Sequence, residues 1–280
     1  MQMKCAWQKL LSVLPQHMRG EVDKLGEDCL QELRLRLGDP VQLVTAKGLK
    51  NLSVRVMQSD ISFVVNAASR YSPWAAETAA SGYITAPGGH RIGLCGQCAV
   101  HSGVVTGIRD VTSLCIRVAR ECFGVAVGIP ITGSVLILGP PGSGKTTLLR
   151  DLIRMIADGG TGSVSVVDER GELFPRESEF DRGKQTDVLT GCDKASGIDM
   201  VLRTMGPHYI AVDEITSQKD CQALIRAGWC GVKLIATAHA TDLTDLQLRP
   251  VYRPLLQTGL FDTIIVLKPD KSWRLERVKL

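Results

Sequence analysis

Aromatic residues are scarce in this chain of 280 residues: they make up 5% of the sequence, and few of them stand beside basic residues. Proteins that bind single-stranded nucleic acid stack the bases on exposed aromatic rings next to lysines and arginines. The composition therefore argues against a nucleic-acid-binding protein.

The sequence also lacks a long, uninterrupted apolar run. Its most apolar long window, residues 124–139, is broken by Pro130 and several glycines and makes a poor membrane span. Residues 1–14 lack the apolar core and the cleavage site of a secretory signal peptide. Nine cysteines, an odd number without an export signal, indicate reduced thiols. We therefore expect a cytoplasmic protein.

A second cysteine pair that would complete a zinc site is missing. Cys95-Gly96-Gln97-Cys98 is a single C-x-x-C, without histidines at ligand spacing and without a helix start beside it. We interpret this spacing as a coincidence or as packing residues rather than as a metal or redox site.

Positive and negative residues balance over most of the chain. The net charge of +4 arises in residues 1–118, which hold 13 Lys/Arg and 9 Asp/Glu, whereas residues 119–280 hold 20 of each. An excess this small favours an ordinary solvated surface over a nucleic-acid or lipid patch.

What the sequence does contain is a complete phosphate-binding motif. Gly139-Pro140-Pro141-Gly142-Ser143-Gly144-Lys145-Thr146 reads G-x-x-x-x-G-K-T, between an apolar run at 135–138 and a helical pattern at 147–153. The glycines let backbone N–H groups point inward at phosphate oxygens, and the helix N-terminus adds partial positive charge. Lys145 can reach the β- and γ-phosphates, and the Thr146 hydroxyl can ligate Mg²⁺. The motif predicts binding of a nucleoside triphosphate.

From residue 135 onward, short apolar runs alternate with stretches of helical spacing. The predicted strands are 135–138, 164–167, 209–212, 233–236 and 263–267, and the predicted helices are 145–157, 195–204, 221–227 and 246–258. This alternation predicts an α/β domain with a parallel sheet, helices on both faces and ligands at the carboxyl ends of the strands.

The first part of the chain has a different pattern of predicted helices and strands. We predict helices over 6–18 and from a cap at Ser59 or Asp60 to 71, and strands over 30–37, 41–45, 52–56, 82–85, 91–95, 99–100 and 111–118. This is a small α+β domain in which we recognise no chemistry. Glycine and proline interrupt both patterns within residues 124–133, so the predicted domains are 1–123 and 124–280.

Polar residues follow three of the predicted strands of the α/β domain. Asp213-Glu214 ends the strand 209–212, Asp168-Glu169 ends the strand 164–167, and His239 closely follows the strand 233–236. In P-loop enzymes one such acid completes the Mg²⁺ shell and a neighbouring glutamate polarises the attacking water. We expect Asp213 in the metal shell and Glu214 as the base. Asp168, Glu169 and Glu172 are placed to face the γ-phosphate too, and His239 or Thr237 to hydrogen-bond the phosphate or the water.

These motifs together resemble the secretion-ATPase superfamily, the hexameric motors of type II and type IV secretion and of pilus extension and retraction. The resemblance is carried by residues 139–146, 168–173, 202–207 running into 210–215, and 236–239. They correspond there to the Walker A loop, the Asp box, the Walker B strand and the His box. The resemblance implies a RecA/AAA-like P-loop NTPase domain that binds ATP and Mg²⁺.

Three further stretches, 89–94, 108–110 and 116–121, are similar to the sporulation branch of that superfamily. The similarity covers nearly the whole chain, most specifically residues 85–240. It implies a homo-oligomeric ring, a hexamer, in the mother cell. Such a ring lies at the inner face of the membrane and drives a channel of inner-membrane proteins between mother cell and forespore.

The resemblance has two further consequences. Asp213 stands where these ATPases usually have a glycine, and Arg170-Gly171 stands where their Asp box has a proline, so Glu214, Glu169 and Glu172 all stay candidates for the base. In such rings arginines of the N-terminal domain approach a nucleotide between subunits. The candidates here are Arg91, Arg109, Arg117 and Arg120, with Arg91 and Arg117 preferred.

We therefore predict a two-domain, Mg²⁺-dependent ATPase that forms ADP and phosphate. The nucleotide-binding residues are Gly139, Pro140, Pro141, Gly142, Ser143, Gly144, Lys145, Thr146 and Thr147, the metal ligands Thr146 and Asp213, and the catalytic residues Lys145, Glu214, Glu169, His239, Arg91 and Arg117. We predict adenine rather than guanine as the base only because the sequence lacks the N/T-K-x-D pattern that recognises guanine. The alternatives are a nucleic-acid-binding P-loop ATPase that uses the basic N-terminal half and a nucleotide-regulated assembly module with negligible turnover.

Overall fold

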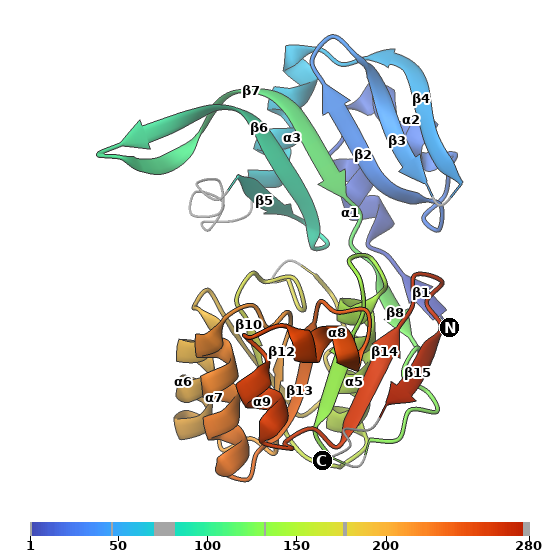
Figure 1. Cartoon of the computed structure of the whole chain (residues 1–280). Helices are drawn as coiled ribbons and strands as arrows, with labels where there is room; N and C mark the ends of the chain where they lie inside the picture. The colour runs from blue at the N-terminus through green and yellow to red at the C-terminus, as the bar shows by residue number, and fades with distance from the viewer. Residues whose placement is uncertain (1, 46, 70–81, 132, 176–177, 277–280) are drawn as a thin grey trace. The chain divides into compact units, whose positions relative to one another are not determined.

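The computed structural model describes residues 2–45, 47–69, 82–131, 133–175 and 178–276. The chain divides into two compact units (Figure 1). The C-terminal unit comprises Met1–Gln2, Cys122–Phe174 and Asp181–Leu280, and the N-terminal unit comprises Met3–Glu121 and Pro175–Phe180. Two short strands, β1 (Gln2–Lys4) and β8 (Glu121–Phe123), pair with each other.

The C-terminal unit is built on one seven-stranded sheet of order β11-β10-β12-β13-β9-β14-β15. The strands are β9 (Val135–Leu138), β10 (Val164–Asp168), β11 (Thr186–Thr190), β12 (Tyr209–Val212), β13 (Lys233–Ala238), β14 (Thr263–Leu267) and β15 (Trp273–Glu276). Neighbouring strands run parallel except β14 and β15. The predicted parallel sheet is confirmed. The sequence analysis missed β11 and β15, because both are partly exposed edge strands without a continuous apolar run.

Helices cover both faces of this sheet. Helix α5 (Lys145–Asp158) packs against β9, β10, β11 and β13. On the other face, α6 (Lys194–Thr204) and α7 (Gln218–Trp229) share one apolar core with alternate strand residues such as Leu136, Ile210 and Leu234. These helices position the strands so that the carboxyl ends of β9, β10, β12 and β13 lie along one edge.

The predicted helix over 246–258 is wrong. The structure has two short helices there, α8 (Leu243–Leu248) and α9 (Arg253–Gln257). Arg249 between them has extended backbone angles, φ −88° and ψ 116°. The cause is Pro250, because a proline ring disfavours helical angles in the residue before it.

The N-terminal unit is a six-stranded antiparallel sheet of order β4-β3-β2-β7-β6-β5. The strands are β2 (Leu30–Arg36), β3 (Pro40–Thr45), β4 (Gly48–Arg55), β5 (Tyr83–Ala86), β6 (His90–His101) and β7 (Val104–Arg117). Leucines and isoleucines at alternate positions, such as Leu33, Ile92 and Ile116, form one core with three helices. The helices are α1 (Trp7–Ser12), α2 (Gln16–Asp23) and α3 (Gln58–Ser69).

Two predicted helices of this unit differ from the structure. The single helix over 6–18 is wrong, because Pro15, with ψ 144°, separates α1 from α2. Helix α3 begins at Gln58, and Asp60 is not the residue that precedes it. Its carboxylate instead accepts a hydrogen bond of 2.9 Å from the Met57 N–H. The predicted end of this helix at residue 71 lies outside the described residues.

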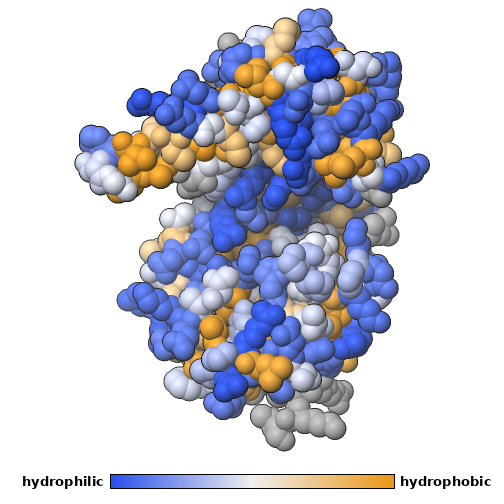
Figure 2. Space-filling view, turned by 45° about the horizontal axis from the view of Figure 1, so that its top comes forward, coloured by the Kyte–Doolittle hydropathy of each residue, from blue (hydrophilic) through white to orange (hydrophobic). Residues whose placement is uncertain are grey.

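The predicted strands at 91–95, 99–100 and 111–118 are parts of one long hairpin, β6–β7. Ser102 and Gly103 form its two-residue turn with φ values of 52° and 79°, as a tight hairpin requires. Cys95 and Cys98 are both exposed and lie on either side of a register shift between β6 and β7, at which β7 has the extra residues. Figure 2 shows apolar side chains over the outer end of the hairpin, where Val100, Val104 and Val105 are exposed.

Within the described part of the chain, no helix has the length and apolar character needed to cross a bilayer.

Candidate active site

The phosphate-binding motif forms the loop between β9 and α5. Gly142 and Gly144 have φ values of 76° and 97°, a region that favours glycine, and Gly144 directly precedes α5. Gly139 is required for a second reason. A side-chain Cβ there would lie 2.5 Å from Ser143 Oγ and 3.0 Å from the Leu267 carbonyl of β14. The sequence thus folds this loop tightly against the sheet, with its N–H groups at the start of a long helix.

Lys145 lies buried inside the loop. Its Nζ donates hydrogen bonds of 2.9 Å to the carbonyl oxygens of Gly139 and Pro140, and lies 3.0 Å from Nδ1 of His239. Burial lowers the pKa of Lys145, and the carboxylates of Asp213 and Glu214 partly oppose this shift. The ammonium group is thus held where the loop meets the ends of β12 and β13.

Asp213 directly follows β12 and is held between two threonine hydroxyls. Thr146 Oγ1 donates to Asp213 Oδ2 at 2.7 Å, and Thr237 Oγ1 donates to Asp213 Oδ1 at 2.5 Å. The structure therefore brings together the two predicted metal ligands, Thr146 and Asp213. A hydroxyl and a carboxylate are hard oxygen ligands, as Mg²⁺ requires.

Glu214 has a left-handed backbone, with φ 53°, which is uncommon for a residue other than glycine. Such a conformation costs on the order of 1–3 kcal/mol and persists only where the surroundings hold it. Its N–H donates to Thr237 Oγ1 at 2.8 Å. Its carboxylate lies 3.3 Å from Nε2 of His239 and 3.9 Å from the Arg170 guanidinium. The predicted base and the predicted sensor are thus neighbours, and both lie within reach of the loop lysine.

Asp168, at the equivalent end of β10, makes its hydrogen bonds to the loop that follows its own strand. Its carboxylate accepts hydrogen bonds of 2.9 Å from the backbone N–H groups of Glu172, Leu173 and Phe174. Burial raises the pKa of Asp168 to about 6, although these N–H groups stabilise the ionised form. Arg150 of α5 fixes the same loop by donating to the Leu173 carbonyl at 2.7 Å. Asp168 therefore shapes the loop that follows β10.

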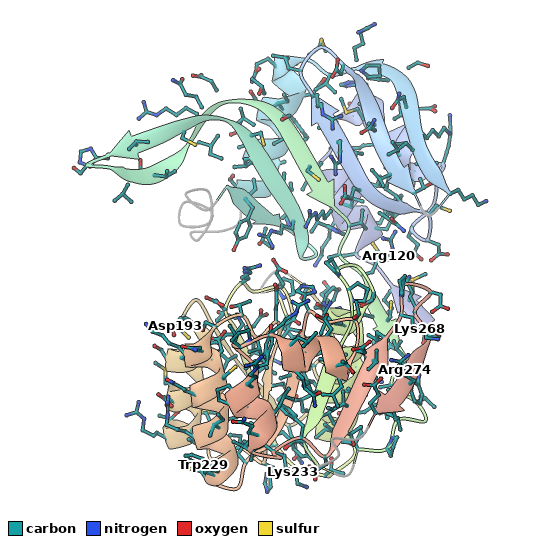
Figure 3. All side chains as sticks on the ribbon, in the orientation of Figure 1. Arg120, Asp193, Trp229, Lys233, Lys268 and Arg274 are labelled. Atoms are coloured by element: carbon teal, nitrogen blue, oxygen red, sulfur yellow. The ribbon has the colours of Figure 1, made fainter. Side chains whose placement is uncertain are left out.

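Glu169 is paired with a lysine that the sequence analysis did not single out. Lys194 Nζ, almost completely buried, lies 2.5 Å from Glu169 Oε2. Lys194 is the first residue of α6, directly after the capping residue Asp193 (Figure 3). The Glu169 carboxylate is thus engaged by a residue of α6, whereas the Glu214 carboxylate lies beside His239, which contacts the loop lysine. This pairing favours Glu214 over Glu169 as the base.

The ends of β10 and β12 enclose a small cavity of about 20 Å³. It is lined by Val167, Asp168, Glu169, Arg170, Glu172, Lys194, Asp213 and Glu214. All the predicted acids of the site therefore line one cavity. Of these acids, Asp213 also contacts Thr146 of the phosphate-binding loop, and Glu214 also contacts His239.

The predicted arginines lie in the N-terminal unit. Arg91 stacks over the Tyr83 ring at 3.9 Å, and Arg117 lies 3.5 Å from the Glu32 carboxylate. Arg91 and Arg117 are direct neighbours across β6 and β7. Arg120, labelled in Figure 3, instead donates to the carbonyl oxygens of Glu27 and Leu30, which gives it a structural role.

The residues present fit a magnesium-bound nucleotide. Ser143 Oγ is buried in the loop and has no hydrogen-bond partner within the described residues, so the loop retains an unused polar atom. Thr147 lies beside Thr146 in the first turn of α5. In the described part of the chain no group of three or more His, Cys, Asp or Glu could hold a metal alone.

Sequence reasoning missed Lys194, Arg150 and the full contribution of Thr237. Nothing in the sequence marks Lys194, because it begins α6 whereas its partner, Glu169, follows β10. Arg150 gives one signal, since it stands inside the apolar stretch 148–153 of a helix. Thr237 was predicted only as a group that could face the phosphate, whereas its hydroxyl is engaged by its own chain.

A protein family and a known relative both match most of this chain. A family model described as Sporulation stage III, protein AA matches residues 4–275. Stage III sporulation protein AA of Bacillus subtilis (strain 168) is 35% identical over 281 residues, which cover 94% of this chain and 92% of that protein.

Solved structures agree on the fold. The ATPase DotB of Legionella pneumophila matches with a TM-score of 0.58 at 18% identity, over 94% of this chain and 80% of that one. The pilus retraction motor PilT with bound ADP matches with a TM-score of 0.60 at 17% identity, over 89% and 76%. At these identities the likeness shows the fold alone. The predicted α/β, RecA-like fold class is confirmed.

Proposed function

This chain belongs to the family described as Sporulation stage III, protein AA, and we propose that it is a Mg²⁺-dependent ATPase that forms ADP and phosphate. The solved structures that share its fold are an ATPase and a pilus retraction motor, in agreement with the resemblance of its motifs. One observation carries the proposal. Lys145, the Thr146–Asp213 pair and the Glu214–His239 pair converge where β9, β12 and β13 end.

Each of these groups has a distinct task in the proposed reaction. The N–H groups of the loop and Lys145 bind and orient the phosphates. Thr146 and Asp213 hold Mg²⁺, which when bound neutralises charge on the phosphate oxygens. The Glu214 carboxylate orients the attacking water and accepts its proton, and His239 keeps that carboxylate in place. The tight loop and the short distances among these groups favour hydrolysis over simple binding.

We extend the proposal to the assembly. The relatives include a pilus retraction motor and a sporulation protein. We propose that this chain works as a homo-oligomer, a hexamer, with residues 1–123 and 124–280 as its functional domains. It would act in the cytoplasm at the inner face of the membrane, with inner-membrane channel proteins of sporulation as partners. Arg91 and Arg117 would reach the phosphates from a neighbouring subunit.

Phosphate release by the purified chain tests the proposal. With millimolar ATP and MgCl₂, release should be steady, should stop when EDTA replaces the magnesium, and should rise more than linearly with protein concentration if subunits share the site. Lys145→Ala is the matched control, since it removes the loop ammonium and should abolish release. A wild-type chain that takes up no Mg·ATP at millimolar concentration would contradict the proposal.

A further inference from the structure

The Thr237 hydroxyl makes two hydrogen bonds within the site. The residue lies on β13 and is fully buried, with 0% of its surface exposed. Its hydroxyl donates to Asp213 Oδ1 at 2.5 Å and accepts from the Glu214 N–H at 2.8 Å. A hydroxyl has one hydrogen to donate, so Thr237 has none left for a phosphate or a water. It therefore acts on its own chain.

The backbone of the same residue completes the arrangement. The Thr237 carbonyl accepts from the Ile215 N–H at 2.9 Å. The regular pairing of β12 with β13 stops at Val212 and Ala236. Beyond that point one residue, Thr237, binds two successive backbone N–H groups, the first through its side chain and the second through its main chain. This fixes the peptide at which Glu214 takes its left-handed conformation, with φ 53°.

The second contact of Thr237 concerns the metal. Asp213 is held by two hydroxyls, Thr146 on one oxygen and Thr237 on the other. If the Thr146 hydroxyl were engaged by a bound Mg²⁺, Thr237 would remain as the donor that orients the Asp213 carboxylate. Groups behind a metal ligand commonly change metal affinity or activity by about 10- to 100-fold when removed.

We propose that Thr237 is a positioning residue that sets two groups at once: the Asp213 carboxylate for Mg²⁺ and the Glu214 peptide for the attacking water. This inference rests on the proposed ATPase function. It differs from a role in sensing the γ-phosphate, because the Thr237 hydroxyl faces Asp213 and Glu214. It predicts that loss of the hydroxyl weakens the coupling between Mg²⁺ and ATP, and that serine, which keeps the hydroxyl, preserves it.

The test compares Thr237→Val with Thr237→Ser by calorimetric titration of ATP, once in EDTA and once in saturating MgCl₂. The ratio of the two affinities is the gain due to Mg²⁺. For Thr237→Val we expect unchanged affinity in EDTA and a gain about tenfold smaller than in the wild type. For Thr237→Ser the gain should stay within threefold of the wild-type gain. Adding Thr237→Val to Asp213→Asn should cause no further loss, since Thr237 acts on the metal through Asp213.

Measurement of kcat tests the second part of the proposal, the effect of Thr237 on Glu214. At saturating Mg·ATP, kcat should fall at least tenfold in Thr237→Val and less than threefold in Thr237→Ser. Thr263→Val, a buried threonine at the start of β14, is the control for the general effect of this substitution on stability and should keep both gain and kcat. If Thr237→Val does not fold, Thr237→Ala makes the same comparison with a smaller side chain.

Three results would overturn the inference: a full Mg²⁺ gain and full kcat in Thr237→Val, a serine variant as impaired as the valine variant, or no Mg²⁺ gain in the wild type. Failure of the proposed function looks different. A wild type that binds ATP with a Mg²⁺ gain but releases no phosphate contradicts hydrolysis, and the titration still decides whether Thr237 positions Asp213.

Discussion

The chain ends two neighbouring parallel strands with the same dipeptide, Asp-Glu, and the two ends have different contacts throughout. Asp168 and Asp213 follow Val167 and Val212, which are register partners in β10 and β12. Asp168 accepts from the N–H groups of its own loop, whereas Asp213 accepts from the hydroxyls of Thr146 and Thr237. The role of an acid at a strand end therefore depends on the donors that contact its carboxylate. The order of the strands determines which donors these are.

The glutamates of the two pairs differ in the same way. Glu169 lies against the buried ammonium of Lys194. Glu214 lies against His239 and, at 3.9 Å, Arg170. We expect the β12 pair to control turnover and the β10 pair to control the structure of the loop. The predictions below test this contrast.

The largest difference should appear between Asp213→Asn and Asp168→Asn. Asp213→Asn should lower kcat by about 10³-fold and remove the dependence of ATP affinity on Mg²⁺, because the amide is a poor ligand for this ion. Asp168→Asn should keep its turnover and should instead lower the free energy of unfolding, measured near pH 4, by about 1–3 kcal/mol, because an amide NH₂ cannot accept from the loop N–H groups. Steady-state kinetics and denaturant unfolding separate the two. A large loss of turnover in Asp168→Asn without a loss of stability would reverse the contrast.

The raised pKa of Asp168 gives a pH-dependent version of the same test. The folded chain holds this proton with a pKa of about 6, against an ordinary value of 3.8, so it binds the proton more tightly than the unfolded chain does. The stabilisation from Asp168 is therefore complete below about pH 4 and is lost as the pH rises to about 6. Relative to Asp168→Asn, the wild type should lose at most about 3 kcal/mol over that range.

Unfolding of both proteins at several pH values measures this difference. A wild type that gains stability relative to Asp168→Asn as the pH rises would show that the three N–H groups dominate and that the pKa is lowered.

The smallest effect is expected from Lys194→Met. Glu169 is partly exposed, at 38%, so water replaces the lost ammonium group, and stability should fall by about 1 kcal/mol or less. Turnover should stay within threefold of the wild type. If phosphate release collapses in this variant, the pair belongs to the chemistry and the assignment of Glu214 alone is wrong.

Much of the site could be predicted from the sequence, because its parts are local. The loop 139–146, the strand that ends at Asp213 and the strand before His239 are each recognisable in a few consecutive residues. Side-chain partners were not predictable. The contacts of Lys194 with Glu169, and of Thr237 with Asp213, join residues 25 and 24 positions apart in the chain. Only the order of strands and helices brings such residues together.

The fold shows the same limit. Continuous apolar runs predicted the central strands, whereas the edge strands β11 and β15 carry mixed sequences and were missed. The prolines at positions 15 and 250 each lie within the span of a predicted helix, and in the structure two short helices replace each of them. Local backbone chemistry outweighed periodicity at both places.

The most direct test of the account compares Glu214→Gln with Glu169→Gln, an identical change at the two strand ends. Both variants should bind Mg·ATP as tightly as the wild type, because neither glutamate touches the loop. Phosphate release should fall by about 10²- to 10⁴-fold in Glu214→Gln and by less than threefold in Glu169→Gln. Equal losses in the two variants, or a Glu214→Gln protein that turns over normally, would contradict the claim that the β12 end carries the chemistry.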